Sequence, residues 1–288
     1  MEKTSNLTQV STIYSAETKN VPLVSVVVTT KNEEKNLDSC LKSIKSQTFK
    51  NIELIVVDNF SGDRTAEIAK KYFAKIYFKG NERSAQRNFG AKVAQGEYLI
   101  YLDADMILSP NLIEKCVSTC EQGTACALYI PERIIGDGFW IKVRDFERSF
   151  YTGTVIDAVR FMRRDLFLRV GGFDESLVGP EDWDFDRKIR KISQTSISPM
   201  PLFHNEGTFN IKQYLKKKSY YTSGIQKYIA KWGSTDLETI KQVGTQYRLL
   251  GVFVEKSKWK KLIKHPSLTI AMYYLRFRVA ITFIEGKA

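Results

Sequence analysis

The chain has 288 residues, 43% of them hydrophobic, so it can bury a sizeable core and form one large domain or a domain with an appendage. The formal net charge of +12 lies at one end: residues 210–288 hold 16 lysines and arginines against 4 acidic residues, whereas residues 1–209 hold 28 of each. A nucleic-acid-binding protein would also carry basic residues on the part that bears its motifs, so no nucleic-acid partner is expected.

The first 20 residues are polar and have no clear period. We expect residues 1–20 to form a loose arm, and not a signal peptide, because no apolar segment follows a charged one. The four cysteines show no spacing typical of a secreted framework. Buried thiols in a reducing compartment are expected; the alternative is a zinc pair at Cys116 and Cys120.

Strand-like and helix-like patterns then alternate along the chain. A β-branched run at residues 21–30 predicts a strand buried on both faces. The next segment predicts a helix, because its apolar side chains share one face at helical spacing. These side chains are Leu37, Cys40, Leu41 and Ile44.

A second buried strand is expected at residues 52–57, with Asp58 at its carboxyl end. The helix after it is expected to begin at a cap formed by Ser61 or Asp63. Its predicted inner face consists of Ile68, Ala69, Tyr72 and Phe73.

Three further elements complete the pattern: a short strand at residues 76–78, a helix at 84–95 and an apolar strand at 97–102. Ser109 is expected to cap the helix that follows, with proline at the first helical position. This order predicts an α/β fold with a largely parallel sheet and right-handed crossovers. In such sheets ligands bind beyond the carboxyl ends of the strands.

The later part of the chain is less regular, with a helix expected around residues 139–151. Beyond His204 the chain becomes helical, basic and aromatic to its end. The apolar segment 268–284 is interrupted by Arg276 and Arg278. A membrane-spanning helix needs about 20 mostly apolar residues, so none is predicted there.

Two acidic side chains directly follow the strand at residues 97–102. Asp103 and Asp105 are one residue apart, and side chains so spaced in an extended chain point the same way. Both carboxylates can then face one hard cation such as Mg²⁺ or Mn²⁺, which also binds a substrate diphosphate. The pattern predicts a metal site; the alternative is a solvated acidic turn.

Residues 24–207 resemble the family 2 glycosyltransferases, which have the GT-A fold. The resemblance rests on five segments that occur in the family's order and approximate spacing: VSVVVTTKNEEKNLDSCLKSI, ELIVVDNFSGDRT, RNFGAKVAQGEYLIYLDAD, GGFDESLVGPEDWDFDRKIR and FHNEG. It implies a catalytic domain at residues 21–209. Its nucleotide-binding half would span about 21–130 and its acceptor half about 131–209, followed by the helical basic region 210–288.

The resemblance also implies six nucleotide-sugar-binding residues. These are Thr29 and Glu33 in the first nucleotide-binding turn, Asp58 at the base or ribose, Arg83 and Arg87 at the base or diphosphate, and Asp103 at the ribose. Other interpretations remain open. Asp58 can instead cap a turn, and the two arginines can pair with surface carboxylates.

The remaining implied roles concern the metal and the acceptor. Asp105 matches the direct ligand of Mn²⁺ or Mg²⁺, and His204 matches a further metal ligand, with a structural histidine as its alternative. Asp182 matches the general base, which takes the acceptor's proton on the face opposite the leaving diphosphate. Glu181 and Trp183 are expected on the acceptor side. Glu181 and Asp182 can alternatively favour a helix N-terminus, and Trp183 can simply pack.

The expected activity is an inverting, non-processive transfer of one sugar from a nucleotide-sugar donor to a glycan or lipid-linked acceptor, at a hydroxyl or lipid phosphate. Processive relatives carry a Q-x-x-R-W motif after the base, which this chain lacks. One alternative is a nucleotidyltransferase, but its phosphate loop typically contains glycine and the TTKNEE turn has none. A nucleic-acid-binding protein is the other alternative.

The basic region interleaves lysines with aromatic residues at 211–232 and again at 256–264, before the apolar segment 268–284. Such segments can lie in the plane of a membrane interface and bind an anionic leaflet. We therefore expect a cytoplasmic protein, peripheral on the inner face of the cell membrane. The alternative is a solvated basic face on helices that pack on the catalytic domain.

Overall fold

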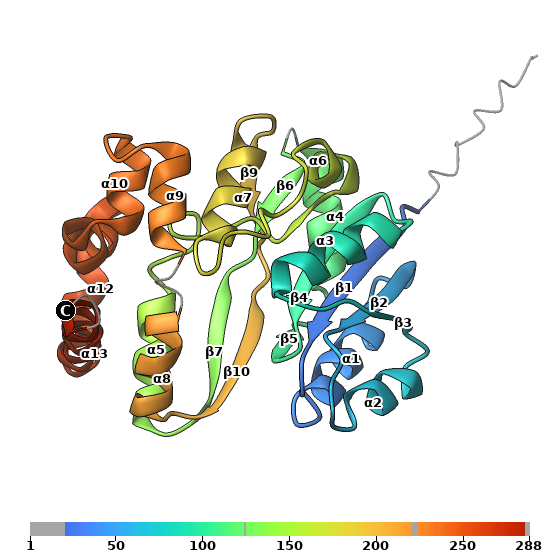
Figure 1. The fold of residues 1–288 in the computed structure, drawn as a ribbon, viewed down its shortest axis with the longest axis horizontal. Coiled ribbons are helices and arrows are strands. Elements are labelled where there is room, and N and C mark those ends of the chain that lie inside the picture. Colours follow the sequence, from blue (N-terminus) through green and yellow to red (C-terminus); the bar gives the residue numbers. More distant parts are fainter. Residues whose placement is uncertain (1–20, 124, 221–223, 286–288) are drawn as a thin grey trace, which may run out of the picture.

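The computed structural model describes residues 21–123, 125–220 and 224–285, so the predicted arm at residues 1–20 lies outside the described residues. Two sheets form its frame (Figure 1). The large sheet has the order β3-β2-β1-β4-β8-β6-β9 and the small one the order β5-β10-β7. The large sheet contains β1 (Val24–Thr30), β2 (Ile52–Asp58), β3 (Lys75–Phe78), β4 (Tyr98–Asp103), β6 (Ala127–Tyr129), β8 (Phe161–Arg163) and β9 (Thr195–Ile197). The small sheet contains β5 (Met106–Leu108), β7 (Glu132–Asp137) and β10 (Leu202–Thr208).

The predicted α/β class with a largely parallel sheet is confirmed. Strands β1 to β4 are mutually parallel, whereas β8 runs antiparallel to both β4 and β6. The register pairs Thr30 with Asp58 and Thr29 with Asp103. The carboxyl ends of β1, β2 and β4 therefore meet at one edge of the sheet, where such folds build their sites.

Helices cover both faces of the large sheet. On one face lie α1 (Leu37–Lys45), α2 (Thr65–Lys71) and α4 (Leu112–Gln122); on the other lie α3 (Arg83–Val93), α6 (Arg164–Arg169) and α7 (Glu181–Arg190). The predicted inner face of α1 is buried throughout. In α3, a Cβ atom at Gly90 would lie 2.3 Å from Val27 Cγ1. A glycine there lets α3 lie directly on β1.

Two local predictions need correction, and one strand was not predicted. Phe73 is 91% exposed, because α2 ends at Lys71 and Phe73 adopts a left-handed conformation beyond it. Helix α4 begins at Leu112, so Ser109 is not its N-cap; the Ser109 hydroxyl instead donates to the carbonyl of Pro201. Strand β5 was not expected, and it pairs with β10.

The C-terminal region packs against α5 (Phe139–Arg148), on the side away from the large sheet (Figure 1). Its helical elements are α8 (Ile211–Tyr220), α9 (Ile225–Trp232), α10 (Leu237–Val243), a π-helical turn (Tyr247–Gly251), α11 (Val252–Val254), a 3₁₀ turn (Glu255–Ser257), α12 (Trp259–Lys264) and α13 (Pro266–Glu285). None of the helices in the described ranges is long and apolar enough to cross a membrane.

Helix α13 joins α5 through a shared core and one buried ion pair. Met272 and Leu275 pack with Phe150 and other side chains of the α5 segment. Arg276 Nη1 donates to Glu147 Oε1 at 2.6 Å, and Arg144 Nη1 donates to Glu147 Oε2 at 2.5 Å. The ion pair therefore links the end of the chain to the middle of the protein.

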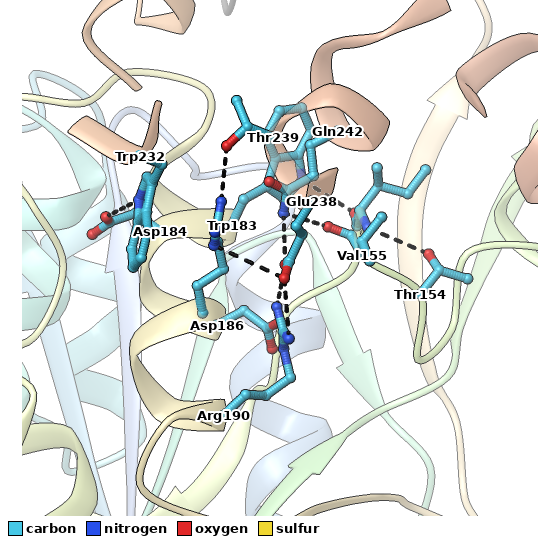
Figure 2. A network of polar contacts seen from close by, with 12 residues as sticks. Thr154, Val155, Trp183, Asp184, Asp186, Arg190, Trp232, Glu238, Thr239 and Gln242 are labelled. Atoms are coloured by element: carbon cyan, nitrogen blue, oxygen red, sulfur yellow. Dashed lines mark hydrogen bonds and ion pairs between the residues drawn. The ribbon is translucent and has the colours of Figure 1, made fainter. Parts of the chain in front are cut away.

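The C-terminal region also braces α7, as Figure 2 shows. The Trp232 indole donates to Asp184 at 2.9 Å, and Arg190 of α7 binds Glu238 of α10. The Gln242 amide donates to the carbonyl of Val155 at 2.6 Å. The helix that begins with Glu181 and Asp182 is thus held from its outer side by α9 and α10.

The buried pair at Glu147 predicts a specific loss of stability in acid. Burial raises the pKa of Glu147, but Arg144 and Arg276 outweigh this effect and lower the pKa from 4.5 to about 2. A carboxylate whose pKa is lowered by folding stabilises the protein above pH 4.5 and loses that contribution as the pH falls towards 2. Glu147→Gln should lower the free energy of unfolding by about 3 kcal/mol at neutral pH and flatten its decline in that pH window.

Urea unfolding at a series of pH values measures both effects. The matched control is Glu67→Gln, because Glu67 forms an exposed ion pair with Lys71 and should contribute little. Equal changes in the two variants would mean that the buried pair does not stabilise the attachment of α13.

Candidate active site

The site lies at the edge of the sheet where β1, β2 and β4 end. Two threonines of β1 hold the acids at the ends of the neighbouring strands, Asp58 in β2 and Asp103 in β4. Thr30 Oγ1 donates to Asp58 Oδ1 at 2.7 Å, and Thr29 Oγ1 donates to Asp103 Oδ1 at 3.2 Å. The strand register that pairs these residues produces both contacts. The central strand therefore fixes the orientation of two predicted nucleotide-binding acids.

Asp58 is buried and both of its carboxylate oxygens are occupied. The Ser61 amide donates to Oδ2 at 2.8 Å, and the Ser61 hydroxyl donates to Oδ1 at 2.6 Å. In this structure Asp58 shapes the loop after β2, as the turn-cap interpretation expects.

Asp103 is held between two arginines of α3. Arg87 Nη2 donates to Asp103 Oδ1 at 2.9 Å, and Arg83 Nη1 lies 3.5 Å from Oδ2. Burial raises the pKa of Asp103, but Arg87 and Arg83 outweigh it and hold the pKa far below its usual range. Asp103 is therefore ionised at neutral pH.

Arg87 is the deepest charged residue of the site, with only 1% of its surface exposed. Its second nitrogen, Nη1, donates to Asp182 Oδ1 at 2.9 Å. The guanidinium lies over the ring of Tyr101 at 4.7 Å and over that of Phe173 at 5.1 Å. A single buried cation thus joins Asp103, at the end of β4, to Asp182, in the first turn of α7.

The residues on either side of Arg87 extend this connection. Gln86 Nε2 donates to the carbonyls of Thr30 and Val57, and Asn88 exchanges two hydrogen bonds with the backbone of Phe173. A Cβ atom at Gly172 would lie 2.4 Å from Asn88 Oδ1. The first turns of α3 therefore fix both the strand ends and the glycine loop that leads to α7.

Glu181 is buried, and only one of its two carboxylate oxygens has a hydrogen-bond partner in the described part of the chain. Its Oε1 accepts from Arg83 Nη2 at 3.2 Å, whereas Oε2 has no hydrogen-bond partner in the described part of the chain. Burial and the neighbouring charge of Asp182 raise the pKa of Glu181. Glu181 thus brings a carboxyl oxygen with unused hydrogen-bonding capacity to the cavity wall.

Asp105 is held by the small sheet. Strand β10 pairs with β5 in a register that places His204 opposite Met106, next to Asp105. His204 Nε2 lies 3.0 Å from Asp105 Oδ2, and His204 Nδ1 lies 2.9 Å from Glu132 Oε1. Burial lowers the pKa of His204, but the hydrogen bonds to Asp105 and Glu132 outweigh it and raise the pKa to about 10.

These residues fit a divalent cation at Asp105. Its second oxygen, Oδ1, is buried and has no hydrogen-bond partner among the residues that the structure describes. Burying a carboxylate oxygen without a hydrogen-bond partner costs free energy, unless a cation or a hydrogen-bond donor binds to it. His204 already uses both ring nitrogens, so its present contacts make it a support for Asp105. No group of three metal-ligating side chains converges in the described ranges.

A cavity of about 450 Å³ joins these residues. Its wall includes six of the predicted site residues: Arg83, Asp103, Asp105, Glu181, Asp182 and His204. It also includes residues that were not predicted, from β7, α5, α8 and the position directly before β8: Glu132, Arg144, Arg148, Arg160, Tyr214 and Lys218 among them. No sequence motif marked these residues, because tertiary packing alone brings them to the acids.

Four predicted residues lie behind or beside this wall. Thr29, Asp58 and Arg87 are buried in support of it, while Glu33 faces the same acids: burial raises the pKa of Glu33, and the charges of Asp105 and Asp103 raise it further. The Glu33 backbone amide donates to Thr65 Oγ1 at 2.8 Å. The turn after β1, which is predicted to bind the nucleotide, is thereby tied to the start of α2.

Trp183 does not line the cavity, which differs from its expected acceptor-side position. Its indole nitrogen donates to the carbonyl of Ile156 at 3.3 Å, and its ring packs edge-on against Tyr228 at 6.0 Å. Arg248 lies over the same ring at 5.3 Å. Because Trp183 follows Asp182 by one helical position, it points to the C-terminal helices and packs there.

The amino-acid sequence of the chain matches a known protein family and several of its members. The family described as Glycosyl transferase family 2 matches residues 25–172. An uncharacterized glycosyltransferase of Haemophilus influenzae is 25% identical over 237 residues, which cover 76% of this chain and 79% of the relative. An uncharacterized glycosyltransferase of Methanocaldococcus jannaschii is 31% identical over 190 residues, or 57% and 63% of the two chains. A chondroitin synthase of Escherichia coli is 25% identical, over 75% of this chain but 35% of its own length.

Solved structures share the fold. A mannosyltransferase from Pyrobaculum calidifontis, in complex with GDP-Man and Mn²⁺, gives a TM-score of 0.62 at 18% identity and covers 94% of this chain and 89% of its own. Residues 1–349 of S. aureus TarS, in complex with UDP-GlcNAc, give 0.54 at 18% identity over 87% and 79%. At this level of identity the likeness concerns the fold, and it confirms the predicted GT-A architecture.

The position of Arg87 predicts a large effect on stability. Arg87→Met leaves Asp103 and Asp182 without their shared cation, and the free energy of unfolding should fall by about 3 kcal/mol or more. Arg87→Lys should recover only part of it, because one ammonium cannot reproduce two guanidinium contacts. Denaturant unfolding followed by tryptophan fluorescence measures the difference. Arg163→Met is the control, since the ion pairs of Arg163 lie near the surface and its side chain is 43% exposed; unfolding of Arg87→Met at the wild-type midpoint would contradict the prediction.

Proposed function

We propose that this chain, which belongs to glycosyl transferase family 2 and therefore catalyses a glycosyl transfer, moves a single sugar from a nucleoside diphosphate sugar to an acceptor hydroxyl or lipid phosphate. The transfer inverts the configuration of the anomeric carbon. The observation that carries this proposal is the position of Asp182. Its carboxylate lines the cavity and is joined through Arg87 to Asp103. A base and a donor-side acid are therefore held in fixed relation.

In the proposed reaction Asp182 accepts the proton of the acceptor hydroxyl as that oxygen attacks the anomeric carbon. The bond from the anomeric carbon to the diphosphate oxygen breaks, and the nucleoside diphosphate leaves with the electron pair. Attack opposite to the leaving group inverts the anomeric centre. Arg87 binds Oδ1 of Asp182, so it orients the base.

The leaving-group end of the proposed site is formed by Asp103 and Asp105. When bound at Asp105 Oδ1, Mn²⁺ or Mg²⁺ would stabilise negative charge on the departing diphosphate. His204 holds the other oxygen of Asp105 and is itself held by Glu132. The nucleotide complexes of the two structural neighbours, one with GDP-Man and Mn²⁺ and one with UDP-GlcNAc, support a nucleotide-sugar donor.

The nucleoside would occupy the turn after β1 and the loop after β2. We propose that Thr29 and Glu33 shape the turn, that Asp58 acts at the base or ribose, and that Arg83 contacts the base or diphosphate. Arg83 also bridges Asp103 and Glu181. It therefore lies between the donor-side acids and the acceptor-side helix α7, where a diphosphate oxygen can replace one of its carboxylate contacts.

A membrane surface is the proposed setting of the reaction. Helix α13 is apolar on two sides: Ala271, Met272 and Leu275 are buried against the protein, whereas Ile270 is 72% and Phe277 64% exposed. An exposed apolar stripe of this kind commonly marks an interaction surface. Its composition suits the interfacial layer of a bilayer.

The helix before it adds charge to this face. On α12 the side chains of Trp259 and Ile263 are exposed, and lysines lie beside them. Polybasic segments gain roughly 1 kcal/mol per charge near an anionic leaflet. The exposed lysines of this segment are Lys256, Lys260, Lys261 and Lys264.

Two substitutions separate the proposed roles of the acids. Asp182→Asn should lower the rate of transfer about a hundredfold or more, because the base is lost, while nucleotide affinity stays nearly unchanged. Asp105→Asn should instead abolish the dependence on Mn²⁺ or Mg²⁺. Transfer from the donor chosen in a thermal-shift screen of nucleotide sugars measures both, with exposed Asp165→Asn as control. Full metal-dependent activity in Asp105→Asn would reject the metal assignment.

The membrane proposal is tested with surface substitutions, because removing α13 would also remove buried Leu275 and the ion pair of Arg276. Ile270→Ser combined with Phe277→Ser should weaken binding to phosphatidylglycerol vesicles about tenfold or more in flotation experiments. Leu237→Ser, which changes a 77% exposed side chain on α10, is the control. Unchanged flotation of the double variant would exclude α13 as the membrane face.

A further inference from the structure

Three aromatic side chains connect the cavity to helix α13. The first is Phe209, which lies between β10 and α8 and lines the cavity wall; the others are Trp140 of α5 and Tyr274 of α13. The ring of Trp140 lies 5.9 Å from that of Phe209 and 6.0 Å from that of Tyr274. Helix α13 lies against both α5 and α8 (Figure 1). The three rings, here called the aromatic row, therefore form one apolar path from the cavity to the last helix.

The aromatic row lies beside the hydrophobic core of this region and is not enclosed by it. Within that core Phe150, Met272 and Leu275 are fully buried. Trp140 and Phe209 are only half-buried, and Tyr274 is 46% exposed. Each ring of the row thus leaves apolar surface in contact with water, which costs free energy. Packing of the core alone does not account for that exposure.

At the cavity end the aromatic row borders on charged groups. The ring of Tyr214, which also lines the cavity, packs 5.5 Å from that of Phe209. The cationic groups of Arg144 and Lys218 lie over the Tyr214 ring at 4.8 and 5.3 Å. Tyr214 is therefore covered by charge, and the boundary between the polar cavity and the apolar row lies at Phe209.

At its other end the aromatic row joins the exposed side of α13. Ile270, Tyr274 and Phe277 are spaced i, i+4 and i+7, so they share one face of the helix, and all three are exposed. The Tyr274 hydroxyl accepts from Arg278 Nη1 at 3.0 Å, so the polar tip of this side chain is satisfied. The face that these residues form is the one proposed above to lie at a membrane surface.

A ligand that contacts both ends of the row must be polar at one end and apolar at the other. Its polar end would share the cavity with Asp182, and the rest of it would contact aromatic and aliphatic carbon. A glycan can stack on single rings, but it is polar along its whole length and does not match an aliphatic side chain such as Ile270. A hydrocarbon chain on a polar head group matches both ends, and each fully buried methylene group strengthens its binding about fourfold.

We propose that the acceptor is lipid-linked and that its hydrocarbon chain lies on the aromatic row, from Phe209 across Trp140 to Tyr274. This inference rests on the proposed function, and it specifies the class of acceptor and the surface that holds its apolar part. The head group occupies the cavity, where its nucleophilic oxygen can face Asp182. The chain extends towards the exposed face of α13 and from there into the membrane.

Alkyl glucosides test the proposal without a membrane. The whole chain is titrated with glucose and with n-hexyl, n-octyl and n-decyl β-glucoside, each below its micelle concentration, and binding is followed by ligand-observed NMR. Affinity for the wild type should rise about fourfold or more for every two methylene groups added, as expected for a chain half-buried on the rings. Affinity that does not depend on chain length, or no binding of any alkyl glucoside, would overturn the inference.

Two substitutions locate the chain on the row. Phe209→Ser should weaken the binding of all three alkyl glucosides, because Phe209 lies at the cavity end. Tyr274→Ser should leave hexyl glucoside unaffected and remove most of the gain from octyl to decyl, because Tyr274 lies at the far end. Phe73→Ser is the control, since Phe73 is an exposed aromatic residue beyond α2 that does not line the cavity.

The effect of chain length separates a binding role of Tyr274 from a structural one. A disturbed structure would weaken all three alkyl glucosides equally, and that result for Tyr274→Ser would contradict the proposal. Cellotetraose is the glycan probe. Binding of cellotetraose that both substitutions weaken, together with alkyl glucoside affinities independent of chain length, would assign the row to a glycan and overturn the inference.

Transfer and nucleotide binding distinguish this inference from the proposed function. Asp182→Asn should lose transfer and bind the alkyl glucosides with the same dependence on chain length as the wild type. Full transfer by Asp182→Asn with that dependence intact would reject the base and support the lipid-binding row. Tyr274→Ser should bind UDP and GDP with Mn²⁺ as tightly as the wild type; an equal loss of nucleotide affinity would overturn the assignment of Tyr274 to the acceptor chain.

Discussion

The site depends on one buried guanidinium. Arg87 lies beneath the cavity, between rings of two aromatic residues, and binds Asp103 and Asp182 with one nitrogen each. Two carboxylates brought close together repel each other, and burial increases the repulsion. The shared cation makes their proximity favourable. Because one acid ends β4 and the other lies in the first turn of α7, Arg87 also fixes α7 relative to the central strands.

Local patterns in the sequence predicted those parts of the structure that depend on near neighbours. The apolar period of α1 and the β-branched run of β1 were sufficient to predict these two elements and their buried faces, since the burial of each follows from its own residues. Asp103 and Asp105 were predictable because an apolar strand ends directly before them. Phe73 was assigned wrongly because the same helical period continues past the point where the backbone turns.

The rest of the site depends on contacts between distant segments, which no local pattern encodes. Glu132 and His204 meet because β7 and β10 pair in the small sheet, although 72 positions separate them. Arg160, which directly precedes β8, and Lys218, on α8, reach the cavity in the same way. Both residue types are common, and only the structure shows that Arg160 Nη1 is buried without a hydrogen-bond partner in the described part of the chain.

The C-terminal region is part of the site and not an appendage to it. Helix α8 supplies Tyr214, Lys217 and Lys218 to the cavity wall, and the Tyr220 hydroxyl donates to Glu82 of the nucleotide-binding half at 2.5 Å. The basic charge of the region is accordingly divided. Lys217 and Lys218 line the cavity, whereas Lys260 and Lys264 of α12 are exposed on the outer surface.

The brace on α7 limits how this enzyme can be recombined (Figure 2). Asp184 and Arg190 of α7 find their partners in Trp232 and Glu238, about 50 positions later in the chain. A chimera joined after residue 209 would keep the acids of the site but separate α7 from the side chains that orient it. A chimera that exchanges the acceptor side between relatives must therefore take α7 and the C-terminal helices from the same protein.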